Sequence, residues 1–585
     1  MIIVKILSFL HFSGVYDMEK QIKVAMGLEK ADLVLKGGNV INVYTGEIEV
    51  ADIAICDGYI AGVGSYCGKK EVNMQGKYLS PGFIDGHLHI ESTMLSPSNF
   101  AKAVLPWGTT TGICDPHEIA NVCGEDGVDY MIEECKNVPF DGMFMAPSCV
   151  PATPYENNGA NIDAKGVDKL LQKCHGIGEF MNAPGVIYCD KDVMDKLKCA
   201  KAKGVVVDGH YPLAGNKELN AYIGAGITTD HECVDVEDAC NKLRRGMYVL
   251  VREGSATRNL RDLFPIINSK TLRRLVFCTD DRQVHDLLSI GHINNNIKIA
   301  IEMGLSPIDA ITMATLNCAE CYKLNDRGAL SAGKIADIVV IDDIYKFNVL
   351  EVYKKGKLVA KDGKALFEAK VLDNKKVRNT VHCNDITEDD LKLKINSDKV
   401  RVIGIEPHNV TTTSLIRKAS ITKGVYDFKD GLSKICVIER HKNTGNIGIG
   451  LIEGYGIKNG AIAVSVAHDS HNIIVCGDND KDMAIAASEI KRVGGGMTAV
   501  HNGKVYDTLE LPIAGLMSDK NIDYIATMTA KLNKFAYEVL NVEKEVEPFM
   551  TLSFMSLVVI PQLKISDKGL FDYQTFSFVD IEVKE

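Results

Sequence analysis

The chain has 585 residues, of which 46% are hydrophobic and 24% charged, a balance typical of a globular protein built from more than one unit. Its formal net charge is −11. Nucleic acid and anionic membranes attract basic surfaces, so we exclude both as the main partner and expect a small-molecule substrate. Seventeen cysteines are scattered through this long chain, which favours reduced thiols and a cytoplasmic location.

The first segment, residues 1–17, contains an apolar stretch at 2–12 that is too short to span a bilayer. It lacks the basic beginning and the small-residue cleavage site of a secretory signal. We therefore expect residues 1–17 to be a disordered extension or a misassigned start ahead of Met18. No other stretch is long and apolar enough to cross a membrane, so no membrane partner is expected.

Residues 18–80 are β-rich, with glycine-containing turns that predict successive hairpins. Residues 328–385 show the same pattern. Because these two segments flank the region between them, we expect them to pair into one small composite β-sandwich.

The central region, residues 81–327, alternates short apolar runs with helix-compatible stretches. Runs that are apolar nearly throughout are typical of parallel strands buried on both faces. Eight strand–helix units in this length predict an α/β fold with a (β/α)₈ TIM-type barrel. The runs cover residues 81–89, 109–115, 142–148, 176–181, 204–210, 226–232, 247–255 and 274–281.

Residues 386–399 form a polar stretch that we predict to be a linker. Residues 400–585 have their own glycine-rich turns and mixed strand and helix patterns. They predict an additional C-terminal α/β domain.

In six of the eight runs the last positions carry His, Asp or Glu, at the places that would form the mouth of a barrel. His87 and His89 are two residues apart at a strand end, so both imidazoles can reach one metal. Glu179, His210, His231 and Asp280 end later runs. Polar residues at strand ends could simply begin loops, but four histidines and several carboxylates predict divalent metal binding, and these ligands suit Mn, Fe(II) and Zn alike. Our expectation is two metal ions per site, Mn or Fe(II) in preference to Zn.

The segments that carry these residues are similar to those of a known family. PGFIDGHLHIES (81–92), GEF (178–180), DGH (208–210), TTDHE (228–232), CTDD (278–281) and GKIADIVV (333–340) resemble the amidohydrolase superfamily and, within it, the bacterial and archaeal adenine deaminases. The resemblance covers the chain from about residue 20 onward. It implies that His87 and His89 bind one metal and His210 and His231 the other, that Glu179 bridges them, and that Asp280 both ligates and transfers protons.

The function implied by the resemblance is hydrolytic deamination of adenine to hypoxanthine and ammonia by a metal-bridging hydroxide, in purine salvage or catabolism. A homo-oligomer is expected. Glu179 stands where dihydroorotases and hydantoinases carry a carboxylated lysine, which disfavours cyclic-amide hydrolysis. A glutamate ligand also occurs in N-acetylglucosamine-6-phosphate deacetylases, so a deacetylase of that type or another amidohydrolase is the alternative.

Five residues that follow the ligand-bearing positions are predicted to bind the substrate: Glu91, Ser92, Glu232, Arg252 and Ser255. A purine edge offers donors and acceptors that carboxylates and hydroxyls can meet. For Glu232, hydrogen bonding to a metal-ligating imidazole is an equal alternative.

Three further histidines have open roles. His117, in CDPHE, could support the ligands or be an additional ligand. His468 and His471, with Asp469 between them, could form a further metal site or a lid contact, or could serve only local turn chemistry.

Overall fold

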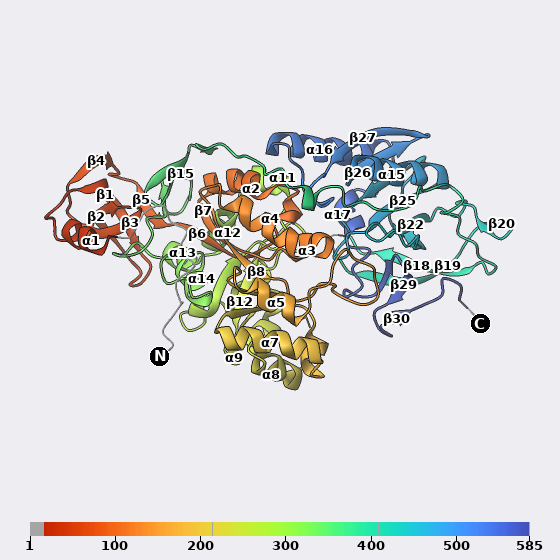
Figure 1. The fold of residues 1–585 in the computed structure, drawn as a ribbon, viewed down its shortest axis with the longest axis horizontal. Helices are drawn as coiled ribbons and strands as arrows, with labels where there is room; N and C mark the ends of the chain where they lie inside the picture. The colour runs from red at the N-terminus through yellow and green to blue at the C-terminus, as the bar shows by residue number, and fades with distance from the viewer. Residues whose placement is uncertain (1–16, 213–214, 408, 584–585) are drawn as a thin grey trace.

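The computed structural model describes residues 17–212, 215–407 and 409–583, so the predicted extension at 1–17 lies outside the described residues except for Asp17. Three parts follow one another along the long axis in Figure 1. A β-sheet that contains the N-terminal strands lies at one end, an α/β unit with parallel strands lies in the middle, and the C-terminal domain lies at the other end.

The middle part holds eight parallel strands, one in each apolar run of the sequence. They form a five-stranded sheet, in the order β10-β9-β8-β7-β6, and a three-stranded sheet, β11-β12-β13. Backbone hydrogen bonds link the sheets at both junctions: Thr228 N–H donates to Val207 O (3.2 Å), and Asp280 N–H donates to His87 O (2.9 Å). The strands are β6 (Phe83–Leu88), β7 (Thr109–Cys114), β8 (Asp141–Ala146), β9 (Gly176–Phe180), β10 (Val206–Gly209), β11 (Thr229–Asp230), β12 (Tyr248–Arg252) and β13 (Leu275–Cys278).

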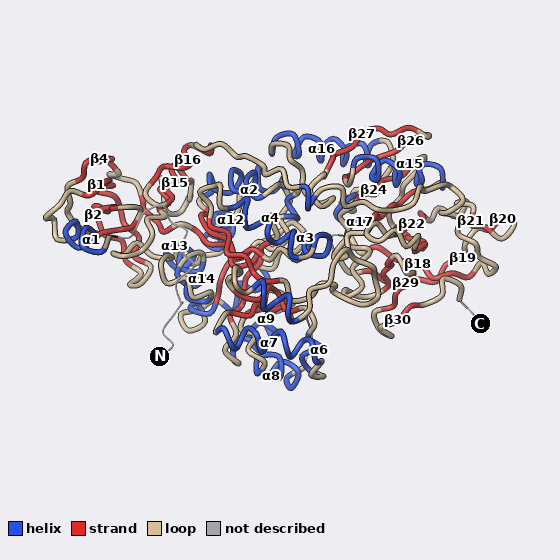
Figure 2. The backbone as a smooth tube through the Cα atoms, viewed as in Figure 1, coloured by secondary structure: helices blue, strands red, loops and turns tan. Residues whose placement is uncertain are grey.

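Helices connect these strands and cover them, as Figure 2 shows. Their ends follow ordinary capping chemistry: the Asp190 side chain accepts from two N–H groups at the start of α7, and Gly204 ends that helix with a φ of 66°. The helices are α2 (Pro97–Val104), α3 (His117–Cys123), α4 (Glu125–Cys135), α5 (Ala164–Leu170), α6 (Ala183–Ile187), α7 (Lys191–Lys203), α8 (Asn216–Gly224), α9 (Val236–Arg244), α10 (Leu260–Leu263), α11 (Val284–Ser289), α12 (Ile293–Glu302), α13 (Pro307–Met313) and α14 (Leu316–Cys321).

The segments before and after the parallel strands meet in one nine-stranded sheet. β14 pairs antiparallel with β5, and β5 pairs in turn with β1. The short helix α1 (Met18–Ala25) contacts β2 and β3. The strands are β1 (Ala31–Asn42), β2 (Glu47–Cys56), β3 (Tyr59–Gly64), β4 (Gly68–Asn73), β5 (Tyr78–Pro81), β14 (Ile338–Ile341), β15 (Val349–Lys354), β16 (Lys357–Lys361) and β17 (Lys364–Ala365).

The C-terminal domain is built on an eight-stranded sheet, in the order β19-β18-β23-β22-β25-β24-β26-β27. Helix α15 (Asp480–Val493) packs against β24, β25 and β26 of this sheet, and α16 (Ile522–Glu538) and α17 (Pro548–Ser553) follow. The sheet strands are β18 (Lys399–Ile405), β19 (Thr412–Lys418), β22 (Ser433–Ile438), β23 (Ile447–Glu453), β24 (Gly460–Val464), β25 (Ile473–Gly477), β26 (Gly496–His501) and β27 (Lys504–Glu510). Smaller strands are β20 (Ile421–Thr422), β21 (Val425–Tyr426), β28 (Leu563–Ser566), β29 (Gly569–Asp572) and β30 (Ser577–Phe578).

The C-terminal domain packs directly on the middle part. Ser518 N–H donates to Met94 O, and Asn157 N–H donates to the Asp567 carboxylate, both at 2.9 Å. Leu391, in the stretch predicted to be a linker, is fully buried. This stretch therefore packs as part of the folded protein.

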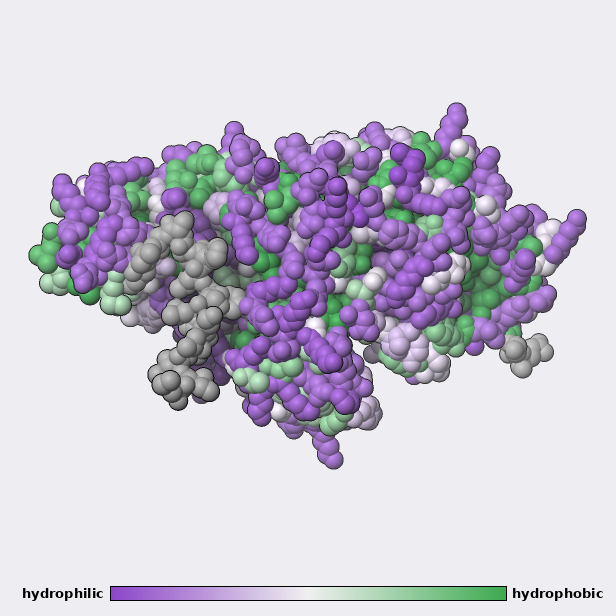
Figure 3. All heavy atoms as spheres, viewed as in Figure 1, coloured by the Kyte–Doolittle hydropathy of each residue, from purple (hydrophilic) through white to green (hydrophobic). Residues whose placement is uncertain are grey.

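The visible face of the molecule is mainly hydrophilic, with small scattered apolar patches (Figure 3). Among the helices of the described residues, none has the length and apolar character needed to cross a bilayer.

Candidate metal centre and active site

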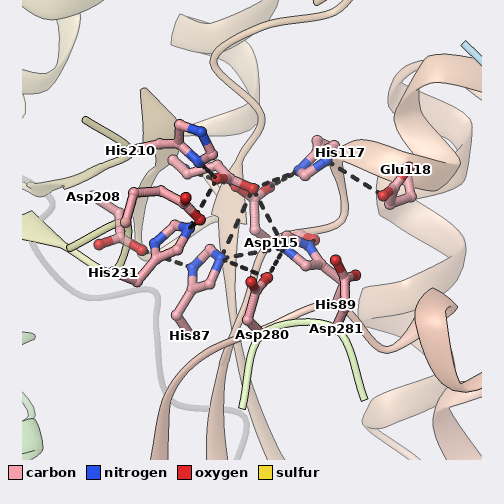
Figure 4. A network of polar contacts seen from close by, with 12 residues as sticks. His87, His89, Asp115, His117, Glu118, Asp208, His210, His231, Asp280 and Asp281 are labelled. Atoms are coloured by element: carbon pink, nitrogen blue, oxygen red, sulfur yellow. Dashed lines mark hydrogen bonds and ion pairs between the residues drawn. The ribbon is translucent and has the colours of Figure 1, made fainter. Parts of the chain in front are cut away.

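The six predicted metal ligands lie together at the C-terminal ends of the parallel strands. Figure 4 labels His87, His89, His210, His231 and Asp280 among them. His87 belongs to β6 and His89 follows it directly, while Glu179 lies in β9. His210, His231 and Asp280 follow β10, β11 and β13. Five of the six residues are buried, and His210 is only partly exposed. The fold therefore brings together residues that are up to 193 positions apart, counted from His87 to Asp280.

One half of the cluster is centred on His89. Its Nε2 atom lies 3.2 Å from His87 Nε2, 3.3 Å from Glu179 Oε1 and 3.1 Å from Asp280 Oδ1. In the other half, Glu179 Oε2 lies 2.7 Å from His210 Nδ1 and 3.3 Å from His231 Nε2. Glu179 thus presents one carboxylate oxygen to each pair of histidines, the arrangement required of a bridging ligand.

The hydrogen bonds of His87, in β6, and of His89, directly after this strand, show that the cluster suits a cation. His87 Nδ1 lies 3.0 Å from Asp208 Oδ2, and His89 Nδ1 lies 3.0 Å from the carbonyl oxygen of Asp115. Because these partners are acceptors, each imidazole keeps a proton on Nδ1, and Nε2 is the nitrogen that faces the cluster, where a metal would bind in place of a proton. Two Nε2 atoms 3.2 Å apart beside two carboxylates form a donor set for divalent metals.

The charges of the cluster also indicate that it suits a cation. Burial would lower the pKa of His210, but the carboxylates of Glu232 and Glu179 raise it to about 9. Burial would raise the pKa of Asp280, but Arg252 and a hydrogen bond from His89 hold it well below its usual range. The carboxylates therefore attract positive charge to this site, and a divalent metal can supply that charge in place of protons.

Asp208 and Asp115 support the cluster, a role that the sequence did not predict for either carboxylate, although Asp115 stands at the end of the second run. The Asp208 carboxylate contacts His87 and also accepts hydrogen bonds from Tyr322 (3.0 Å) and Thr229. The Asp115 carboxylate accepts from the Glu179 N–H at 2.7 Å. Their positions, two residues before His210 in DGH and two before His117 in DPH, are a signal that could have identified them.

The comparisons with known proteins identify the family. The family described as "Amidohydrolase family" matches residues 78–359, and "Adenine deaminase C-terminal domain" matches residues 409–577. An adenine deaminase of Clostridium acetobutylicum is 47% identical over 96% of this chain and 100% of its own length. The chain belongs to the adenine deaminase family.

Another adenine deaminase, from Nitratidesulfovibrio vulgaris, is 46% identical over 96% of this chain and 98% of its own length. Among solved structures, the β-aspartyl dipeptidase of Fervidobacterium islandicum AW-1 is 16% identical, with a TM-score of 0.46, over 57% of this chain and 98% of that one.

The five predicted substrate-binding residues of this adenine deaminase family member lie in two places. Arg252 and Glu232 lie at the ligand cluster, where Arg252 Nη1 is 2.5 Å from both Glu232 Oε1 and Asp280 Oδ2. Glu91, Ser92 and Ser255 line a pocket beside the cluster. In that pocket Ser92 donates to Asp281, and Ser255 donates to Asp286 at 2.6 Å.

The C-terminal domain reaches this site through the loop after β24. His468 Nδ1 lies 2.6 Å from Glu118 Oε1, and His471 Nε2 contacts the other oxygen of the same carboxylate. His117 lies between Glu118 and the cluster, with Nδ1 3.4 Å from Glu179 Oε1. The sequence singled out these histidines individually, but it could not show that Glu118 joins them.

Proposed function

We propose that this member of the adenine deaminase family hydrolyses adenine to hypoxanthine and ammonia at the His–Glu–Asp cluster. The observation that carries the proposal is the similarity to adenine deaminases along nearly the whole chain, including the C-terminal domain. The N-acetylglucosamine-6-phosphate deacetylase alternative is not favoured, because the relatives matched at this identity and coverage are adenine deaminases.

His87, His89, Glu179, His210, His231 and Asp280 would hold two divalent metal ions, with Mn or Fe(II) favoured over Zn. Such ions lower the pKa of water to about 7 and so make a nucleophile available at neutral pH. The eight parallel strands, with hydrogen bonds at both junctions between their two sheets, support a closed (β/α)₈ barrel that holds the ligands on one rim.

The side chains of the site have defined tasks in this reaction. Asp280 takes the proton from the water that attacks C6 of adenine and passes it to the departing amine. Arg252, 2.5 Å from Asp280 Oδ2, fixes the orientation of that carboxylate. Arg252 also contacts Glu232 at 2.5 Å, so one guanidinium group orients the carboxylates of both Asp280 and Glu232.

We place the enzyme in the cytoplasm, in purine salvage or catabolism, as a homo-oligomer. All seventeen cysteines are free, which suits a reducing compartment.

A direct assay tests the function. Purified protein supplied with Mn²⁺ is incubated with adenine, and hypoxanthine and ammonia are measured in parallel. Equal amounts of the two products are expected. Metal-loaded protein that leaves adenine unchanged, while it hydrolyses an N-acetyl sugar phosphate, would contradict the proposal.

A further inference from the structure

A pocket lies between the rim of the parallel strands and the C-terminal domain. The space between its walls is about 570 Å³, which includes open solvent at the pocket mouth. The strand rim contributes Glu91 and Asp281, which neighbour the ligands His89 and Asp280. The pocket therefore opens next to the place where the chemistry is proposed to occur.

The other wall of the pocket belongs entirely to the C-terminal domain and is mainly apolar. Phe549 and Met550 of α17, with Val464 and Met497 of the sheet, line it. Phe554 stacks on the imidazole of His468, with ring centroids 4.4 Å apart and an interplanar angle of 16°. A flat heteroaromatic ligand needs apolar surface against its faces and a few polar groups at its edge. This wall supplies the apolar surface.

His468 is the histidine of this wall, and its orientation is fixed. Its Nδ1 lies 2.6 Å from Glu118 Oε1, and its ring is backed by Phe554. No hydrogen bond is found for Nε2 among the described residues, and the side chain lines the pocket. Burial would lower the pKa of His468, but Glu118 raises it to about 9, so Nε2 carries a proton at neutral pH.

We propose that the C-terminal domain forms one wall of the purine site, in which His468, oriented by Glu118, donates a hydrogen bond from Nε2 to a ring nitrogen of the substrate. This inference rests on the proposed deamination of adenine and specifies how the ring is bound. Glu118 is then a positioning residue, and the C-terminal domain determines affinity for the purine.

The variant His468→Asn tests the contact. Asparagine places an amide where Nδ1 lies, so the hydrogen bond to Glu118 can persist, but nothing replaces Nε2. A hydrogen bond from a charged donor is worth about 10- to 100-fold in affinity, so kcat/KM for adenine should fall by that factor, mainly through KM. Phe554→Leu, which removes the aromatic backing, should weaken binding by roughly 2- to 10-fold.

Binding is measured separately by titrating adenine into metal-loaded Asp280→Asn protein, with and without His468→Asn. The dissociation constant should rise by the same factor as KM. His501→Asn is the matched control, because His501 lies in β26 of the same domain and does not line the pocket. Its kinetics should equal those of the wild type. Metal content and melting temperature should be unchanged in His468→Asn.

The outcomes separate the two proposals. If the wild type deaminates adenine and His468→Asn binds and converts it normally, the pocket inference is wrong and the function stands. Loss of metal or of thermal stability in His468→Asn, with unchanged affinity for adenine, would also overturn it by showing a structural role. If the wild type binds adenine in a His468-dependent way without releasing ammonia, the proposed function fails and the binding site stands.

Discussion

Replacing Asp208 with asparagine tests how His87 is prepared for a metal. The carboxylate accepts hydrogen bonds on both oxygens: Oδ2 faces His87 Nδ1 at 3.0 Å, and Oδ1 faces Tyr322 Oη at 3.0 Å, Gly209 N at 3.2 Å and the Thr229 hydroxyl. An asparagine side chain must turn its NH₂ group toward one of these sides. Facing His87, it would shift the imidazole proton to Nε2 and remove the lone pair from the cluster.

The expected loss of metal affinity follows from the loss of the hydrogen bond between Asp208 and His87. Partners that orient a metal-bound histidine typically contribute 10- to 100-fold in metal affinity, which corresponds to about 1.4–2.7 kcal/mol. The metal-free protein is titrated with Mn²⁺, and bound metal and ammonia release are followed together. We expect Asp208→Asn to need a correspondingly higher Mn²⁺ concentration for half-maximal activity.

Tyr322→Phe is the matched control for Asp208→Asn. It removes one hydroxyl donor from the same carboxylate and leaves Oδ2 free to accept from His87. Its Mn²⁺ affinity should stay near that of the wild type. If Asp208→Asn binds Mn²⁺ as tightly as Tyr322→Phe, then Asp208 does not set the tautomer of His87 and the reasoning is refuted.

Three further predictions follow. Asp280→Asn should retain metal but lose roughly 10²- to 10⁴-fold in kcat, as measured by ammonia release, and near-normal turnover would remove Asp280 from proton transfer. Burial lowers the pKa of Lys564 to about 7, below its ordinary value, so the unfolded state binds more protons and this residue makes stability rise with pH from about 7 upward. In urea unfolding, the wild type should therefore gain about 3 kcal/mol relative to Lys564→Met between pH 7 and pH 9.5, whereas parallel curves would contradict the low pKa. Cys67 and Cys189, the exposed thiols, should react first with a thiol reagent in the native protein, as mapped by mass spectrometry; prior labelling of buried Cys278 would disagree with the structure.

The parallel strands were predictable because each is a short apolar run that ends in a polar residue. β13 illustrates this: Leu275–Cys278 is fully buried, and Asp280 follows two residues later. The same pattern placed His87, Glu179 and His210 at one end of the strands without any knowledge of their contacts. Whether they bind metal stays a prediction for the titration.

Contacts between distant segments could not be predicted in the same way. Glu118 and His468 are 350 positions apart, and neither lies at a strand end. The packing of the middle part against the C-terminal domain brings them together, and no periodic pattern within either part of the sequence records that packing. Leu391 lies in a polar stretch whose average composition concealed its burial against the C-terminal domain.

The pairing of β5 with β14 also has a consequence for synthesis on the ribosome. β5 ends at Pro81 and β14 begins at Ile338, so one edge of β5 lacks its partner until about 260 further residues have been made. At about 5–20 residues per second, this interval is roughly 13–50 s. During that time the nascent N-terminal sheet presents open hydrogen-bonding groups, and a chaperone that covers strand edges would protect the chain until β14 emerges.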